Sequence, residues 1–264
     1  MSFTCFNTVV REKVAFVEID LARKANCMTR EFWDELPLLM SELDSCDDVA
    51  VVVISGSGKH FSSGIDAKIL VDIMENDSDD KTAYIEAEIR KMQLAISSVE
   101  ACSKPVIAAI HGACVGGGVD LITACDIRMS TFSSAFCVLE TKLGIVADLG
   151  TLQRLPKLVG EQCARELSYS SRMFTGYKAK KLGLVRSLHF TKEKLLKAAL
   201  VLAKEFAEMP LEAVRGTKKS LNFSRDHSVQ EGLSQIAREN SNNLQSEQTA
   251  EQIRGLKERL SKSK

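Results

Sequence analysis

Short hydrophobic runs rich in β-branched residues alternate with segments whose apolar residues recur at helical spacing. The hydrophobic runs cover residues 13–21, 49–56, 104–112, 126–131 and 135–140. Between them, residues 30–44 and 81–102 place an apolar residue at every third or fourth position. The runs predict strands and the periodic segments predict amphipathic helices. This alternation predicts an α/β class with largely parallel sheets, and a Rossmann fold is also compatible with it.

The second part of the chain has a mainly helical pattern. After about residue 150, only residues 183–190 have the composition of a strand. Residues 193–209, 211–223 and 228–264 are predicted to be helical, and Pro210 separates the first two helices. A helical tail with one apolar stripe commonly docks on its own core or on another subunit.

Composition excludes several classes of partner. Lys plus Arg equals Asp plus Glu at 35 each, so no net field attracts nucleic acid or an acidic membrane. The eight cysteines form no CxxC pair and the four histidines form no HExxH motif, which predicts reduced thiols and no bound metal. No apolar run reaches the roughly 20 residues of a membrane span.

The termini contain no clear targeting signal. The N-terminal "MSFTCFNTVVREK" lacks the apolar core of a signal peptide, and the C-terminal "SKSK" differs from the peroxisomal SKL. We expect an intracellular soluble protein, with a mitochondrial or peroxisomal compartment left open.

A glycine-rich segment, "HGACVGGGVDLITACDIR" (111–128), joins a predicted strand to a predicted helix. Backbone N–H groups at a helix N-terminus lack intrahelical acceptors and carry the positive end of the helix dipole. Glycines would let an acyl oxygen approach these groups. A tight turn that requires positive φ is the simpler interpretation of the glycine run alone. The GxGxxG spacing of a Rossmann dinucleotide site is absent.

A second loop of this kind is "GKHFSSGIDAKIL" (58–70), where small residues again precede a helix start. Asp66 in it is also a good N-cap for that helix. Two backbone N–H groups that converge on one point form an oxyanion hole, and loss of one donor typically costs about 3 to 4 kcal/mol of transition-state stabilisation. The two loops together therefore predict such a site.

Three carboxylates follow the glycines in apolar surroundings: Asp120, Glu140 and Asp148. Each alone is more readily explained as a helix cap or a salt-bridged surface charge. Together within one short window, they are typical of a site where burial and like charge raise carboxyl pKa values toward neutrality. Such a group of acids can both remove and donate protons at pH 7.

The same segments resemble the enoyl-CoA hydratase/isomerase (crotonase) superfamily over roughly residues 14–245. The resemblance rests on "KPVIAAIHGACVGGGVDLITACDIR", "GKHFSSGIDAK", "GTLQRLPKLVG" and "YKAKKLGLV". Within the superfamily, "SSGID", "GGGVDLI", "ADLGTLQRLPK" and "SRDHSVQEGL" are most similar to the Δ3,5-Δ2,4-dienoyl-CoA isomerase subgroup. Enoyl-CoA hydratases carry Glu where this chain has Asp120, and no acid at the position of Asp148.

The resemblance implies a fold and a set of substrate contacts. The fold is a crotonase (ClpP-like) spiral of repeated ββα units over residues 1–195, which carries the active site. A helical region over residues 196–264 would serve oligomerisation and cover the active site. The implied oxyanion donors are the N–H groups of Ile65 and Gly117. The other implied substrate-binding residues are Lys24, Gly64, Asp66, Ala67, Lys68 and Gly118. Lys24 and Lys68 are equally well explained as solvated surface charges.

The resemblance also implies a reaction. Glu140 would remove a proton from carbon 2 of a 3,5-dienoyl-CoA, Asp148 would protonate carbon 6, and Asp120 would be the third acid of the site. The protein would act in fatty acid β-oxidation, without a cofactor because CoA is part of the substrate, as a homotrimer or homohexamer. The alternatives are a 2-enoyl-CoA hydratase, a Δ3-Δ2-enoyl-CoA isomerase, and an acyl-CoA-binding scaffold without activity. Phe32 and Trp33 are predicted to be core residues.

Overall fold

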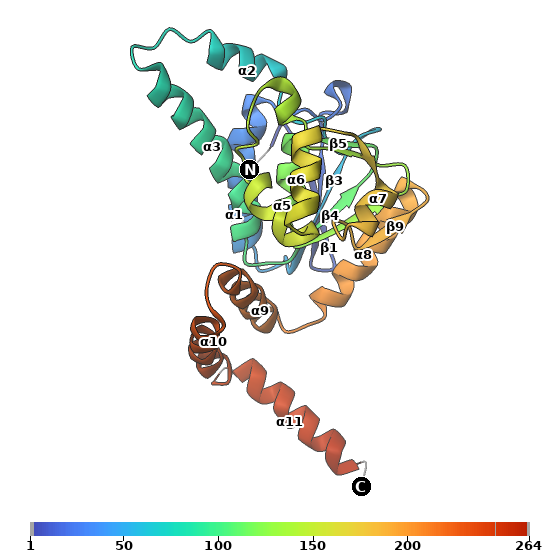
Figure 1. Cartoon of the computed structure of the whole chain (residues 1–264). Helices are drawn as coiled ribbons and strands as arrows, with labels where there is room; N and C mark the ends of the chain where they lie inside the picture. Colours follow the sequence, from blue (N-terminus) through green and yellow to red (C-terminus); the bar gives the residue numbers. More distant parts are fainter. Residues whose placement is uncertain (1–2, 246, 263–264) are drawn as a thin grey trace. The chain divides into compact units, whose positions relative to one another are not determined.

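The computed structural model describes residues 3–245 and 247–262, in two compact units that divide after Lys204 (Figure 1). Each unit is described by itself. The first unit contains all the strands and the predicted site residues. The second unit consists of helices.

A six-stranded sheet forms the centre of the first unit. Its strands, in spatial order, are β1 (Phe6–Arg11), β2 (Val14–Ile19), β3 (Val51–Gly56), β4 (Val106–Ile110), β6 (Ile127–Thr131) and β9 (Ser187–His189). β1 and β2 form an antiparallel hairpin, and the pairs from β2 to β9 are parallel. All residues of β3 and β4 are buried, which explains why both strands read as continuous apolar runs.

A second, smaller sheet lies beside the glycine-rich segment. It contains β5 (Ala113–Val115), β7 (Ala135–Cys137) and β8 (Phe174–Thr175), in that spatial order. β5 and β7 are parallel, with Cys114 opposite Phe136, and β8 is antiparallel to β7. This sheet fixes the backbone directly before the first glycine of the run.

Helices cover the sheets of the first unit. They are the short 3₁₀ helices η1 (Ala22–Lys24) and η2 (Glu140–Leu143) and the α-helices α1 (Arg30–Ser45), α2 (Ala67–Met74), α3 (Lys81–Ala101), α4 (Gly117–Ala124), α5 (Thr151–Val159), α6 (Glu161–Ser170), α7 (Gly176–Lys181) and α8 (Lys192–Ala207), the last of which runs past the unit boundary. α1 and α3 pack against each other (Figure 1), and α4 contacts both α3 and α5. Every residue of α4 is buried, so the helix after the glycines is a core element.

The second unit contains α9 (Leu211–Ser224), α10 (Val229–Asn243) and α11 (Glu247–Lys262). A capping box starts α10: the Ser228 hydroxyl accepts from the Glu231 N–H, and the Glu231 carboxylate accepts from the Ser228 N–H. Lys219 of α9 and Glu239 of α10 form an ion pair at 2.8 Å. Within the described residues, no helix is both long and apolar enough to cross a membrane.

The predicted α/β class is confirmed, with differences in detail. The run 135–140 is a strand only to Cys137, because η2 begins at Glu140. β1 and β5 were not predicted, since β1 has exposed polar residues and β5 is only three residues long. Pro210 precedes α9 as expected, and the helical segment 228–264 contains two helices. The Rossmann alternative is disfavoured by the separate β5-β7-β8 sheet, from which the glycine run emerges.

Candidate active site

The glycine run begins the buried helix α4. Gly116 is the N-cap, with a φ of +51° that favours glycine, and its N–H donates to the Cys137 carbonyl at 3.0 Å. A Cβ on Gly116 would lie 3.3 Å from Oε1 of Glu140. Gly118 faces the first loop, where its Cβ would lie 3.3 Å from Ser62. The glycines therefore let the backbone of the run lie close to Glu140 at Gly116 and close to the first loop at Gly118.

The first loop connects β3 to α2 and lies against β5. Ser62 forms a parallel bridge with Cys114, with Ser62 N–H donating to Ala113 O and Val115 N–H donating to Ser62 O. Gly64 has a φ of +90°, and a Cβ there would lie only 2.7 Å from Val115 O. Only glycine therefore fits this position without a shift of the neighbouring strand.

A buried asparagine supports this loop from behind. Asn26 is fully buried, and its amide donates to the carbonyls of Ser57 at 2.9 Å and His60 at 2.8 Å. The backbone carbonyl of Asn26 accepts from the Ser62 hydroxyl at 2.8 Å, and that hydroxyl accepts from the Gly64 N–H at 3.1 Å. Sequence reasoning assigned no role to Asn26, because an isolated Asn after a basic segment has no distinctive spacing.

The two predicted oxyanion donors lie close together. Met28 N–H donates to Gly64 O and Asp66 N–H donates to Met28 O, so Ile65 between them directs its own N–H away from Met28. A Cβ on Gly117 would lie 3.6 Å from the Ile65 nitrogen, and one on Gly64 would lie 3.3 Å from the Gly117 nitrogen. Gly117 is the first residue of α4, where N–H groups lack an intrahelical acceptor. This geometry suits a carbonyl oxygen that becomes an oxyanion.

Asp120 lies in the first turn of α4 and is almost completely buried, at 1% exposure. The Thr151 N–H donates to its Oδ1 at 2.7 Å. Burial raises the pKa of Asp120 to about 6; the Thr151 hydrogen bond and the Arg154 charge oppose this rise, whereas the Asp148 charge adds to it. The carboxyl group of Asp120 is thus buried, has one oxygen hydrogen-bonded to the Thr151 N–H, and has a pKa of about 6.

Glu140 is the first residue of η2 and is half-buried. Burial raises its pKa to about 7, and the charges of Asp120 and Asp148 add to the rise. Its Oε2 is inaccessible to solvent and has no hydrogen-bond partner among the described residues. A buried carboxylate oxygen without a partner is energetically costly, which makes Glu140 a candidate for contact with a bound ligand.

Asp148 lies in the loop between η2 and α5 and is half-buried. Burial raises its pKa as well. Its charge acts on both Asp120 and Glu140, so the structure brings the three predicted acids into one electrostatic site. The like charges favour states in which part of the group is protonated.

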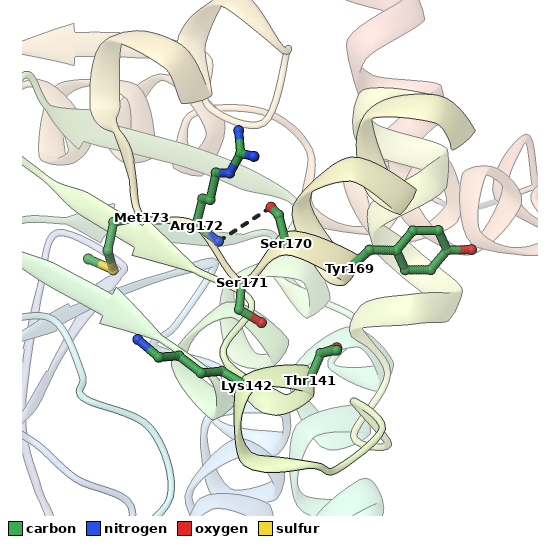
Figure 2. Close-up of a pocket in the computed structure, with 7 residues that line it drawn as sticks. All are labelled: Thr141, Lys142, Tyr169, Ser170, Ser171, Arg172 and Met173. Carbon is green, nitrogen blue, oxygen red and sulfur yellow. Dashed lines mark hydrogen bonds between the residues drawn. The ribbon is translucent and has the colours of Figure 1, made fainter.

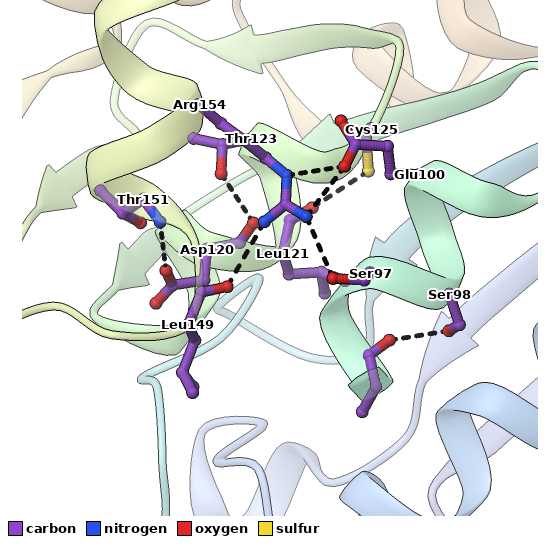
Figure 3. Close-up of polar contacts among 11 residues, drawn as sticks. Ser97, Ser98, Glu100, Asp120, Leu121, Thr123, Cys125, Leu149, Thr151 and Arg154 are labelled. Atoms are coloured by element: carbon purple, nitrogen blue, oxygen red, sulfur yellow. Dashed lines mark hydrogen bonds and ion pairs between the residues drawn. The ribbon is translucent and has the colours of Figure 1, made fainter. Parts of the chain in front are cut away.

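The loop that carries Asp148 is held by polar contacts that the sequence did not reveal. The Arg154 guanidinium pairs with Glu100 at 2.9 Å, donates to the Ser97 hydroxyl at 3.2 Å and contacts the Leu149 carbonyl at 3.4 Å (Figure 3). The spacing of Ser97 and Glu100 on α3 places them on one helix face, but polar residues at this spacing are common on exposed helices. Only the folded chain shows their partner.

The remaining predicted substrate contacts lie around the first loop. Asp66 is the N-cap of α2, accepting from the Lys68 N–H, so its structural interpretation is confirmed. Its carboxylate also lies 3.6 Å from the Lys24 ammonium, whose side chain is 63% exposed. Ala67 and Lys68 are exposed. Lys24 and Lys68 are therefore accessible cations near the oxyanion loop, and their role in binding stays a prediction.

A separate surface pocket lies on the other side of η2. Thr141, Lys142, Tyr169, Ser170, Ser171, Arg172 and Met173 line it (Figure 2). None of the three acids lines this pocket, although Glu140 directly precedes Thr141. The pocket is therefore separate from the three predicted acids.

Other sequence expectations concern the core and metals. Phe32 and Trp33 are buried in the hydrophobic core, as predicted. All eight cysteines are free thiols. Within residues 3–245 and 247–262, no group of three or more His, Cys, Asp or Glu residues is arranged to hold a metal ion.

Comparison with known proteins identifies the family. Residues 10–263 match the family model for enoyl-CoA hydratase/isomerase. The chain belongs to this family. The roles that the resemblance implies for the two loops and the three acids stay predictions.

Two relatives of this chain are named as the same enzyme. The chain is 45% identical to the peroxisomal Delta(3,5)-Delta(2,4)-dienoyl-CoA isomerase of Arabidopsis thaliana over 233 residues, which cover 86% of this chain and 84% of that protein. It is 39% identical to the mitochondrial Delta(3,5)-Delta(2,4)-dienoyl-CoA isomerase of Mus musculus over 257 residues, which cover 96% and 79%.

Solved structures confirm the predicted crotonase fold. The enoyl-CoA hydratase of Bacillus anthracis superposes with a TM-score of 0.88 at 26% identity, covering 97% of both chains. A putative enoyl-CoA hydratase of Thermobifida fusca in complex with CoA superposes with a TM-score of 0.81 at 27% identity, covering 91% of this chain and 93% of that one.

The fit of Gly64 against β5 leads to a first prediction. We expect Gly64→Ala to lower the free energy of unfolding by about 1 to 3 kcal/mol, because of the positive φ and the contact with Val115 O. Gly144→Ala is the control, since Gly144 also has positive φ but no atom within 4 Å of its Cβ. Urea denaturation measures both. Equal losses in the two variants would contradict the steric account of the loop.

The raised pKa of Glu140 leads to a second prediction. The folded protein favours the neutral acid, so ionisation destabilises it as pH rises from about 4.5 through about 7. Glu140→Gln stays neutral and should be more stable than the parent protein at pH 8 by about 1 to 3 kcal/mol, with little difference at pH 4. Denaturation at both pH values measures this. Exposed Glu166→Gln is the control, and a pH-independent effect at Glu140 would contradict the assignment.

Proposed function

We propose that this protein is a Δ3,5-Δ2,4-dienoyl-CoA isomerase of fatty acid β-oxidation. The observation that carries the proposal is that the charges of Asp120 and Asp148 act on the buried Glu140, while the backbone nitrogens of Ile65 and Gly117 lie close together where the two loops meet. The two relatives named as this enzyme, at 39 to 45% identity over most of the chain, support the proposal.

The reaction begins at the thioester. Its carbonyl oxygen would accept hydrogen bonds from the Ile65 and Gly117 N–H groups, which makes the protons on carbon 2 more acidic. Glu140 would act as the general base that removes one of these carbon 2 protons, since the pKa of Glu140, about 7, matches physiological pH. The electron pair left on carbon 2 delocalises through the two double bonds as a dienolate, whose negative oxygen the two donors stabilise.

The reaction ends at the far end of the conjugated system. Asp148 in its acid form would protonate carbon 6, the electrons of the dienolate would shift back, and the double bonds would lie at carbons 2 and 4. One proton enters Glu140 and one leaves Asp148, so the acids return to their first state by proton exchange with solvent or each other. Burial, which raises the pKa of Asp148, favours the acid form that this step needs.

Asp120 would act as the third acid. Its Oδ1 already accepts from Thr151 N–H, and its charge raises the pKa of Glu140. A hydratase would need a longer carboxylate here to activate water together with Glu140. The shorter Asp120 and the additional acid at Asp148 favour transfer of a proton along the acyl chain over addition of water.

The protein's surroundings follow from this activity. The substrate would be an acyl-CoA thioester, with Gly64, Gly118, Asp66 and Ala67 shaping the loops and Lys24 and Lys68 near the CoA phosphates. No cofactor is needed, because acids and backbone donors perform each step. We further propose a homotrimer or homohexamer, formed through the helical C-terminal region, in a mitochondrion or peroxisome like those named for the two relatives.

The direct assay uses 3,5-octadienoyl-CoA with the purified protein. We expect the absorbance of a conjugated 2,4-dienoyl-CoA to appear, and Glu140→Gln or Asp148→Asn to lower the rate by about 100-fold to 10,000-fold, the usual contribution of a positioned acid or base. Asp47→Asn, an exposed acid, is the control and should retain full activity.

Four outcomes would contradict the proposal or one of its parts. Rapid hydration of crotonyl-CoA without turnover of the dienoyl substrate would favour the hydratase, and rapid turnover of a 3-enoyl-CoA alone would favour the Δ3-Δ2 isomerase. An Asp148→Asn variant with full activity would contradict the role of Asp148. Tight binding of CoA esters with no turnover of any of the three would support a scaffold.

A further inference from the structure

The segment that carries Asp148 has no regular secondary structure of its own. It lies between the end of η2 at Leu143 and the start of α5 at Thr151. Gly144 and Gly150 in it have positive φ values of +75° and +116°. A proton donor on such a segment needs fixed neighbours, because the position of its carboxyl group decides which carbon it reaches.

One face of α3 supplies these neighbours. Gln93, Ser97 and Glu100 are spaced at i, i+4 and i+7, so they lie along one side of the helix. The Gln93 amide donates to the backbone carbonyl of Asp148 at 2.7 Å. Ser97 and Glu100 hold Arg154, and Arg154 contacts the Leu149 carbonyl, the next one along the chain (Figure 3).

We propose that Gln93 is a positioning residue that aligns Asp148 with the far carbon of the substrate, and that the Arg154–Glu100 pair supports the same loop. This inference rests on the proposed isomerase function. Gln93 acts through the backbone of Asp148 and touches no reacting atom. Its effect is therefore on the protonation step at carbon 6 and not on the removal of the proton from carbon 2.

The Gln93 hydrogen bond has the properties that this role requires. A backbone carbonyl only accepts, so the N–H side of the Gln93 amide must face Asp148. The bond is short, partly buried and spans 55 positions of sequence, which ties a loop to the rigid middle of a 21-residue helix. Glu140 lies outside this contact, on η2, and the oxyanion donors lie on α4 and the first loop.

Arg154 provides the second support but is a less specific probe. Its guanidinium covers Gly150, where a Cβ would lie 1.8 Å from Nη1, so a larger residue there would displace the guanidinium. Its charge also lowers the pKa of Asp120, so a substitution would change the acids as well as the loop. Gln93 is uncharged, and its substitution leaves the charges of the site intact.

The test separates the two proton transfers in the full-length protein. With 3,5-octadienoyl-CoA in D₂O, deuterium at carbon 2 of the recovered substrate reports the Glu140 step, and formation of 2,4-dienoyl-CoA reports the complete reaction. In Gln93→Leu we expect product formation to fall about tenfold to 100-fold while exchange at carbon 2 stays within about twofold, so that the ratio of exchange to product rises. Glu100→Gln, which weakens the hold on Arg154, should raise the ratio in the same direction by a smaller factor.

Gln153→Leu is the matched control, because Gln153 is exposed on α5 close to the same loop. Its ratio should equal that of the parent protein. If exchange and product formation fall together in Gln93→Leu, or if neither falls, the positioning role is wrong. If Gln93→Leu does not fold, an unchanged ratio in Glu100→Gln overturns the role of the α3 face. Failure of the parent protein to form any 2,4-dienoyl-CoA would instead contradict the proposed function, which distinguishes the two claims.

Discussion

The close approach of two backbone segments, Ser62–Ile65 and Cys114–Gly117, is the constraint on which the site depends. The Ser62 N–H donates to Ala113 O and the Val115 N–H donates to Ser62 O, which joins the two segments, and Gly64 fits against Val115 O only because it has no side chain. One segment follows β3 of the large sheet and the other extends into the small sheet as β5. The positions of the two predicted oxyanion donors are therefore set by the sheets.

The acids are built around this junction at some cost in stability. Asp120 is on the same buried helix as Gly117, and Gly116 allows Glu140 to approach the beginning of that helix. Burial raises the pKa of all three carboxyl groups, so their ionised forms are disfavoured in the folded protein. The Thr151 N–H and the Arg154 charge offset part of the cost at Asp120. The pKa values of Asp120 and Glu140 are raised to about 6 and about 7, a range that suits proton transfer, and the pKa of Asp148 is raised as well.

Periodicity predicted much of the fold, and the sequence context of the two loops and the three acids marked them as candidate parts of a site. The buried parallel strands were predictable because β3 and β4 are continuous apolar runs, and the three acids because apolar neighbours surround each of them. β5 was missed, since three residues within a glycine-rich segment carry no strand pattern. Asn26 and Gln93 were missed because each donates to a backbone carbonyl that is 31 to 55 positions away in sequence. Arg154 was missed because its side-chain partners Ser97 and Glu100 lie 57 and 54 positions away on α3. Which acids share one site is likewise a property of the folded chain.

The central claim is that a proton leaves carbon 2 and another enters carbon 6 of a bound dienoyl thioester. The most direct measurement is the location of deuterium, by NMR, in the product formed from 3,5-octadienoyl-CoA during a single turnover in D₂O. The account predicts 2,4-octadienoyl-CoA that carries deuterium at carbon 6. Deuterium at carbon 4, or a 3-hydroxyacyl-CoA product, would contradict it.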